Sequence, residues 1–143
     1  MFFIGQYNHN IDNKGRVALP AKFRVELKKA VVTKGLDNCL FVYPKKEWDK
    51  MAEKLAALSV SKSNTRAFSR LMLAGAIEVE FDKQGRIILP EYLRNFANLK
   101  KEVVIAGLYT RLEIWDKDAW LKYQQEMEKN SNEIAENLNE LGV

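Results

Sequence analysis

The chain has 143 residues, a formal net charge of +4 and an apolar content of 47%, which is ordinary for a globular protein and argues against disorder. This length suits one domain or two very small ones, and units of about 70 residues are only marginally stable alone. The single cysteine excludes an internal disulfide and fits a reducing compartment. The longest apolar runs have seven residues, which excludes a membrane helix of about 20.

The positive charge is unevenly distributed along the chain. Residues 1–70 carry 14 Lys and Arg against 6 Asp and Glu, residues 71–125 carry 8 against 8, and residues 126–143 carry 1 against 5. A basic half is compatible with nucleic-acid binding, and a solvated, lysine-rich surface explains it equally well. The N-terminal segment lacks the basic and long apolar regions of a secretion signal, so we expect a cytoplasmic protein.

The chain opens with a predicted hairpin. Residues 3–11 alternate in part between apolar and polar side chains, which predicts a strand. Residues 12–16, DNKGR, place Asp first and Gly fourth, the pattern of a type I turn closed by a glycine bulge. Residues 16–19 are then the returning strand. Pro20 fits the first position of a short helix predicted over residues 21–29.

The rest of the first half is predicted to contain two strands and two helices. The strands are expected over residues 31–34 and 40–43, and the helix that starts at Pro44 carries apolar residues at helical spacing. Residues 59–64 are polar and rich in serine, so they are the best candidate for a linker. A further helix is predicted over residues 65–75.

The second half of the chain repeats the first. DNKGR at residues 12–16 returns as DKQGR at residues 82–86, and the gapless match at an offset of 70 extends to Arg24 and Arg94. Further on, the apolar positions recur at an offset of 72. We therefore interpret the chain as a tandem repeat of one small unit. The second unit should have strands over 77–81, 86–89, 103–108 and 112–115 and a short helix over 91–97.

The last predicted helix follows Asp116, a good N-cap residue. It carries apolar residues at intervals of seven, namely Trp120, Met127, Ile134 and Leu141. Such a stripe either covers the protein's own core or forms a seam for a partner helix. The predicted organisation is a first repeat over residues 1–58, a linker and connecting helix over 59–76, a second repeat over 77–120, and an acidic amphipathic helix over 121–143.

Two copies of Asp-x-x-x-Arg, each followed by an apolar-Leu-Pro step, closely resemble the MraZ family of SpoVT/AbrB-type bacterial DNA-binding proteins. Further matches are Gly5-x-Tyr7, AKFR at residues 21–24, TRAF at 65–68 and AGA at 74–76. The resemblance covers the chain from Met1 to Trp120. It implies an α+β fold, namely a swapped-hairpin (AbrB-like) β-barrel built from two tandem pseudo-symmetric repeats with flanking helices.

The resemblance also implies a function. The protein would be a sequence-specific transcriptional regulator, usually a repressor, of the division and cell-wall gene cluster that includes its own gene. It would bind short repeated elements of double-stranded promoter DNA as a homo-oligomeric ring, in the cytoplasm at the nucleoid. The alternative is an antitoxin-like protein-interaction module that acts through the acidic segment from residue 126 to residue 143.

The family's recognition surface corresponds to the two repeated turns, which are both complete here. The predicted DNA-binding residues are Asp12, Lys14, Arg16, Arg24, Asp82, Lys83, Gln84 and Arg86. A planar arginine fork pairs bidentately with O6 and N7 of guanine or with phosphate, and a lysine at a turn tip suits a phosphate contact. For Arg16 the alternative is an ion pair with Asp12 across the turn, and both interpretations are compatible because the Asp can orient the fork. For Arg24 the alternative is a solvated helix face or an ion pair with a nearby acidic residue.

The sequence carries no pattern of a cofactor, metal or catalytic site. One histidine, His9, and one cysteine cannot supply a zinc set within one chain. Neither a phosphate-binding glycine loop nor a nucleophile elbow is present. Asp12 and Asp82 each precede an arginine by four residues, which would lower the carboxyl pKa, the wrong direction for a general acid. We expect no enzyme activity, no cofactor, no small-molecule substrate and no membrane partner.

Overall fold

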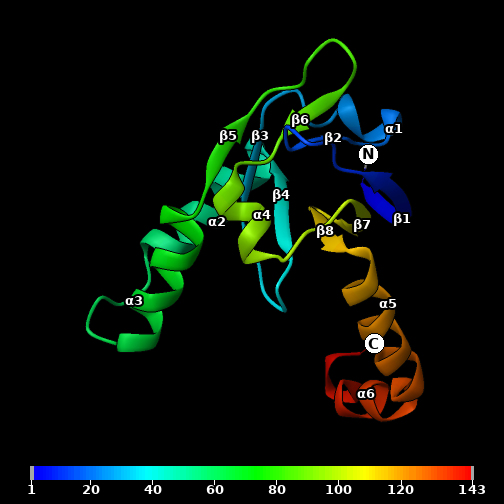
Figure 1. Ribbon diagram of the computed structural model, residues 1–143. Helices are drawn as coiled ribbons and strands as arrows, with labels where there is room; N and C mark the ends of the chain where they lie inside the picture. Colours follow the sequence, from blue (N-terminus) through cyan, green and yellow to red (C-terminus); the bar gives the residue numbers. More distant parts are fainter. Residues whose placement is uncertain (1, 143) are drawn as a thin grey trace.

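The strands form a six-stranded antiparallel sheet and a separate two-stranded ribbon in the computed structural model, which describes residues 2–142 (Figure 1). The first half contains β1 (Phe3–Asn10), β2 (Arg16–Ala18), α1 (Ala21–Arg24), β3 (Ala30–Lys34), β4 (Leu40–Pro44) and α2 (Lys45–Ala56). The second contains α3 (Ser63–Ser69), the π-helical turn η1 (Arg70–Ala74), β5 (Ile77–Val79), β6 (Arg86–Ile88), α4 (Glu91–Phe96), β7 (Glu102–Tyr109) and β8 (Leu112–Asp116). The chain closes with α5 (Lys117–Lys129), α6 (Ser131–Asn137) and η2 (Asn139–Leu141).

The two repeats exchange strands. The order in the sheet is β1-β7-β8-β4-β3-β5, which is unchanged when the repeats are interchanged. The first strand of each repeat pairs with the third strand of the other, β1 with β7 and β5 with β3. At the centre Leu40 lies opposite Ile114 and Val42 opposite Leu112. Each repeat therefore completes its sheet with a strand from the other, and the two small units share one core.

The α+β class is confirmed, and the pairing of the described strands does not make a closed barrel. β1 and β5 remain the edges of the six-stranded sheet, and β2 and β6 pair with each other as the ribbon. A single isolated bridge between Ile11 and Val17 joins β2 to the end of β1. The ribbon covers one face of the sheet. Its inward side chains, Val17 and Ile87, are buried against inward-facing residues of the central strands, Val32, Leu40, Val42, Ile105, Leu112 and Ile114.

Helices cover the opposite face of the sheet, because the alternate residues of its strands are also apolar. Trp48 and Leu55 of α2 and Met72 of η1 pack against Val31, Phe41, Tyr43 and Trp115. Trp120 of α5 packs edge-on against Trp115, with ring centroids 5.4 Å apart. Within residues 2–142, no helix combines the length and the apolar character that a bilayer span requires.

Several element ends differ from the prediction. Pro20 precedes its helix as a cap with extended backbone and is not the first helical residue, and Pro90 has the same place before α4. The helix expected over 21–29 stops at Arg24, and the N–H of Leu27 then bonds the carbonyl of Arg24 in a tight turn. The expected single C-terminal helix is interrupted at Asn130, which caps both α5 and α6. Asparagine has a low helix propensity and favours such capping positions.

Candidate nucleic-acid interface

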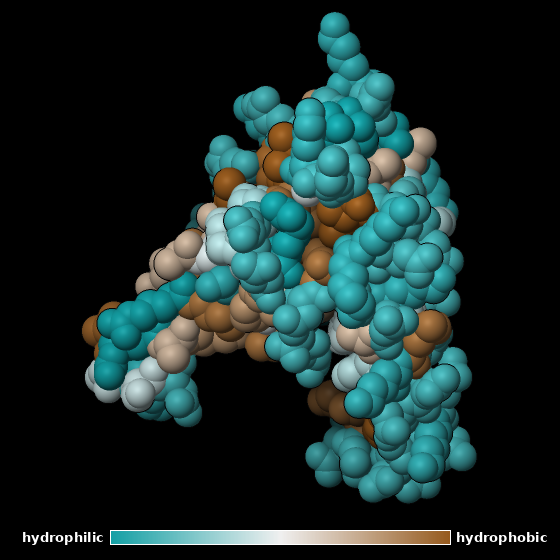
Figure 2. All heavy atoms as spheres, viewed as in Figure 1, coloured by the Kyte–Doolittle hydropathy of each residue, from teal (hydrophilic) through white to brown (hydrophobic). Residues whose placement is uncertain are grey.

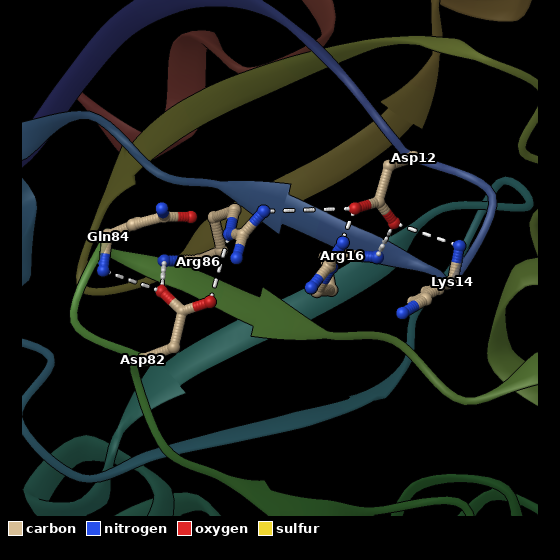
Figure 3. Close-up of polar contacts among 6 residues, drawn as sticks. All are labelled: Asp12, Lys14, Arg16, Asp82, Gln84 and Arg86. Atoms are coloured by element: carbon tan, nitrogen blue, oxygen red, sulfur yellow. Dashed lines mark hydrogen bonds and ion pairs between the residues drawn. The ribbon is translucent and has the colours of Figure 1, made fainter.

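The turn between β1 and β2 is held by the side chain of Asp12 (Figure 3). Its Oδ1 accepts the backbone N–H groups of Lys14 and Arg16, both at 2.9 Å. The N–H of Gly15 donates to the Asp12 carbonyl at 3.0 Å. Gly15 has a φ of 81°, a left-handed conformation that glycine adopts without steric cost. The glycine-bulge turn predicted from DNKGR is therefore formed.

The turn before β6 has the same geometry. Oδ1 of Asp82 accepts the backbone N–H groups of Gln84 and Arg86, both at 2.9 Å. The N–H of Gly85 donates to the Asp82 carbonyl at 3.0 Å, and Gly85 has a φ of 76°. Figure 2 shows hydrophilic side chains over this loop, at the top of the view.

The two motif arginines are oriented by the same carboxylates. Nε of Arg16 donates to Oδ2 of Asp12 at 2.6 Å, and Nε of Arg86 donates to Oδ2 of Asp82 at 2.9 Å. Nη1 of Arg86 also lies 3.9 Å from Oδ2 of Asp12, which links the two turns electrostatically. Because each carboxylate engages the Nε of its own arginine, the two-nitrogen end of each fork is directed away from that carboxylate. The predicted ion pair therefore leaves the bidentate edge of Arg16 for another acceptor, whereas the same edge of Arg86 has one nitrogen toward Asp12.

Both arginines lie on the outer face of the ribbon. In the register of the ribbon, Arg16 lies opposite Ile88 and Arg86 lies opposite Ala18. The pair between them, Val17 and Ile87, points inward and is buried. The arginine side chains are 30% and 28% exposed. The ribbon thus presents two oriented guanidinium groups to solvent.

The two turn tips lie at opposite ends of the ribbon (Figure 3), because β2 and β6 are antiparallel and each turn precedes its strand. Lys14 is exposed at one end. Lys83 and Gln84 are exposed at the other. The predicted tip residues therefore flank the two arginines.

Arg24 lies at the turn of the opposite repeat. Its Nε donates to the Leu19 carbonyl at 3.0 Å, and its guanidinium covers Gly85 so closely that a Cβ there would lie 2.1 Å from Cζ. Arg94 is not among the predicted residues, yet it makes the matching bond to the Leu89 carbonyl at 2.9 Å and lies against Gly15. The match between Arg24 and Arg94 in the repeat is the signal that could have included it.

The hydrogen bonds of the turns keep both aspartates ionised. The backbone N–H of Arg16, followed by its side chain and the N–H of Lys14, lowers the pKa of Asp12 from 3.8 to about 2. The pKa of Asp82 is also lowered, and the largest cause is the hydrogen bond from the backbone N–H of Arg86. At neutral pH both carboxylates are therefore charged and able to hold their arginines. In the part of the chain that the structure describes, no group of three or more His, Cys, Asp or Glu residues is arranged to hold a metal ion.

Known proteins resemble this chain over nearly its whole length. A family model described as "MraZ protein, putative antitoxin-like" matches the chain twice, over residues 2–71 and 72–140. A protein of Caldanaerobacter subterraneus subsp. tengcongensis is 52% identical over 141 residues, which are 98% of this chain and 99% of the relative. Proteins of Halothermothrix orenii (51% over 142 residues, 99% of each chain) and Carboxydothermus hydrogenoformans (53% over 137 residues, 95% of this chain and 96% of the relative) are similar too. All three relatives are named transcriptional regulator MraZ.

Proposed function

The chain belongs to the MraZ family, and we propose that it is a DNA-binding transcriptional regulator that recognises its sites through Arg16 and Arg86. The names of its relatives support the regulatory role. The observation that carries the proposal is the outer face of the ribbon, where two arginines are pre-oriented by Asp12 and Asp82. Two similarly oriented forks on one exposed ribbon are suited to base recognition, since arginine pairs bidentately with guanine.

A short two-stranded ribbon is an element that a DNA major groove admits. A major groove is about 12 Å wide and admits a two-stranded ribbon, and three paired residues span about 10 Å. With Arg16 and Arg86 at the base edges, Lys14 at one tip and Lys83 with Gln84 at the other would contact the two phosphate backbones. Such contacts fix the register of the protein on the duplex without carrying sequence information. The arginine pair then supplies the specificity.

We further propose that the protein represses the division and cell-wall gene cluster that includes its own promoter, in the cytoplasm at the nucleoid. Protomers would assemble into a homo-oligomeric ring on short, repeated operator elements. Each bidentate arginine contributes about 1–3 kcal/mol of base discrimination, so one protomer binds modestly. A ring aligned on regularly spaced elements adds these contributions through effective concentration.

The swapped-hairpin barrel remains part of the proposal. It is supported by the exchange of β1 and β5 between the repeats and by the pairing of β2 with β6. In such a barrel the ribbon closes over the sheet and carries the recognition arginines outward. The division of the chain into repeats over residues 1–58 and 77–120, a connection over 59–76 and a C-terminal segment over 121–143 belongs to the same proposal.

The proposal is tested by a gel-shift titration on the DNA upstream of the gene, with a scrambled duplex of equal length beside it. Wild type should prefer the upstream DNA, and Arg16→Ala should lose that preference. Arg70→Ala, which removes an equal charge from an exposed position on η1, is the matched control and should behave as wild type. Retention of the wild-type preference by Arg16→Ala would contradict the proposal.

A second candidate function is an antitoxin-like interaction module. The C-terminal elements favour it, because Ile134, Leu138 and Leu141 are 44%, 39% and 72% exposed among acidic residues. A partner with an apolar groove and a basic rim would suit this segment. Removal of residues 126–143 distinguishes the two candidates. The module is supported if the full chain retains a protein partner but no promoter DNA and the shortened chain loses that partner. The regulator is supported if the shortened chain binds the operator as the full chain does.

A further inference from the structure

Each repeat carries a pair of lysines outside the recognition turns. Lys28-Lys29 of the first repeat recurs as Lys100-Lys101 in the second, at the same offset of 72 as the surrounding apolar residues. All four residues are exposed. A matched basic pair on a repeated framework therefore occupies an equivalent place in both halves of the molecule.

The strand exchange places each lysine pair beside the turn of the other repeat. The carbonyl of Lys101 accepts the N–H of Ile11 at 2.7 Å, one residue before the first turn. A hollow of about 480 Å³, here called the first-turn hollow, is lined by Asp12, Asn13, Arg94, Lys100 and Lys101 among others.

The equivalent hollow at the other end of the ribbon, the second-turn hollow, is about 470 Å³ and is lined by Arg24, Lys28, Lys29, Glu80, Asp82 and Lys83 among others. The two hollows are related by the same interchange of repeats as the strands of the sheet. Both contain a helix arginine, a lysine pair and the aspartate of the neighbouring turn.

Both hollows have an excess of positive charge. The aspartate in each already binds a motif arginine, Arg16 or Arg86, which offsets its charge. Arg24 and Arg94 are anchored through Nε to backbone carbonyls, so their terminal nitrogens stay available as donors. A guanidinium held at Nε beside two exposed ammonium groups is a donor set suited to a phosphate.

We propose that the two hollows bind backbone phosphates of the DNA duplex whose bases the ribbon contacts, one hollow at each end of the ribbon. This inference rests on the proposed function and adds Lys28, Lys29, Lys101 and Arg94 to the interface. Each repeat then contributes its arginine to the bases and its lysine pair to the phosphates beside the other repeat's turn. Both repeats are needed to build each end of the interface.

The two lysine pairs are not equivalent in charge. Nζ of Lys100 lies 3.0 Å from Oδ2 of Asp116, a buried carboxylate, so part of its charge is already compensated. The residue that matches Asp116 in the first repeat is Pro44, which offers Lys28 no such partner. Lys28 should therefore contribute more than Lys100.

The test is the salt dependence of DNA binding, measured by fluorescence anisotropy on upstream and scrambled duplexes. Lys28→Gln with Lys29→Gln should lower the slope of log K against log salt by about 2, and should weaken both duplexes by the same factor, because each lost phosphate contact removes about 0.9. Lys101→Gln alone should lower it by up to about 1. The matched control is Lys50→Gln with Lys54→Gln on α2, which removes the same charge and should leave the slope unchanged.

If the double variant has the same salt slope as wild type, the inference is overturned. The proposed function is not affected by that result, provided that wild type prefers the operator. An equal decrease in the α2 control also overturns the inference, because the effect would then belong to net charge and not to the hollows. A wild type that binds no duplex contradicts the proposed function, and the inference falls with it. Inorganic phosphate in place of chloride at equal ionic strength competes for the same donors, so it should weaken DNA binding by wild type more than binding by the double variant. Equal losses in both proteins would overturn the inference.

Discussion

The turns at residues 12–16 and 82–86 make the same hydrogen bonds although only three of their five residues are identical. The identical Asp, Gly and Arg each have a separate role, since the carboxylate closes the turn, the glycine adopts a positive φ, and the arginine faces solvent. The two positions that differ contribute to the turn only through the backbone. Their side chains are exposed at the tips. The Asp, Gly and Arg therefore build the turn, and the two positions between Asp and Gly set the charge of its tip.

The surroundings of the two turns differ more than the turns themselves. The first repeat holds the basic excess of the chain, and the single lysine of each tip occupies a different position, Lys14 in the first turn and Lys83 in the second. Asp12 also has Arg86 nearby in addition to its own arginine. We therefore expect the two turns to be equal in base recognition and unequal in electrostatic contacts.

The largest effect should come from removing either motif arginine. Arg86→Ala should reduce operator binding as strongly as Arg16→Ala, by about 1–3 kcal/mol per lost bidentate contact, because both forks occupy equivalent places on the ribbon. The measurement is the affinity of each variant for upstream and scrambled DNA. An Arg86→Ala protein with wild-type preference would show that only the first repeat contacts bases.

The next effect concerns stability. Ala at either turn glycine must adopt a left-handed backbone, at about 1–2 kcal/mol. At Gly15 the new Cβ also meets the Leu89 carbonyl at 2.8 Å, whereas at Gly85 it meets the movable end of Arg24. Gly15→Ala should therefore lower the free energy of unfolding more than Gly85→Ala does in urea titrations.

Gly142→Ala is the control for this pair, because Gly142 has a φ of 73° with no heavy atom within 4 Å of the new Cβ. It lies after the last helical turn and should barely move the unfolding midpoint. Equal destabilisation by all three variants would mean that the close contacts at the turns do not contribute.

A smaller, opposite pair of effects is expected at the tips. Lys14→Gln should lower the salt slope of DNA binding by about 1, and Gln84→Lys should raise it by about 1, with operator preference unchanged in both. The measurement is a salt titration on two duplexes. A change of preference in either variant would show that the tip side chains contact bases.

The smallest effect should be that of pH between 7 and 5. The folded-state pKa of Asp12, about 2, lies below its usual value, so the stability that its carboxylate contributes is fully present above about pH 4 and is lost as the pH falls through about 2. Asp82 shifts in the same direction. NMR titration of the carboxyl carbons checks this: a midpoint of Asp12 near 4 would mean that the turn does not hold its arginine in solution.

Much of the local structure follows from the sequence because it depends on neighbouring residues. The Asp and Gly spacing predicts the turn, and the repeat predicts a second copy with the same strands. Asp116 caps α5 as expected, with its carboxylate accepting the N–H of Ala119. Helix ends are predicted less accurately, since Asn130 interrupts a pattern whose apolar spacing continues through it.

The exchange of strands could not be predicted from local patterns. The spacing that makes β1 a strand does not say that its partner is β7, far along the chain. This exchange brings Arg94 and Lys101 to the first turn and Arg24 to the second. The motif therefore identifies the arginines on the ribbon, whereas the basic residues behind each turn come together only when the two repeats are assembled.

The most direct test of the account is DNA binding by a protein that carries Arg16→Lys and Arg86→Lys together. Lysine keeps the charge but lacks the planar fork that pairs bidentately with guanine. The account predicts that preference for upstream over scrambled DNA disappears, while weak, salt-sensitive binding to both duplexes remains. Unchanged preference in the double variant would contradict the claim that the two Asp-held arginines recognise the operator.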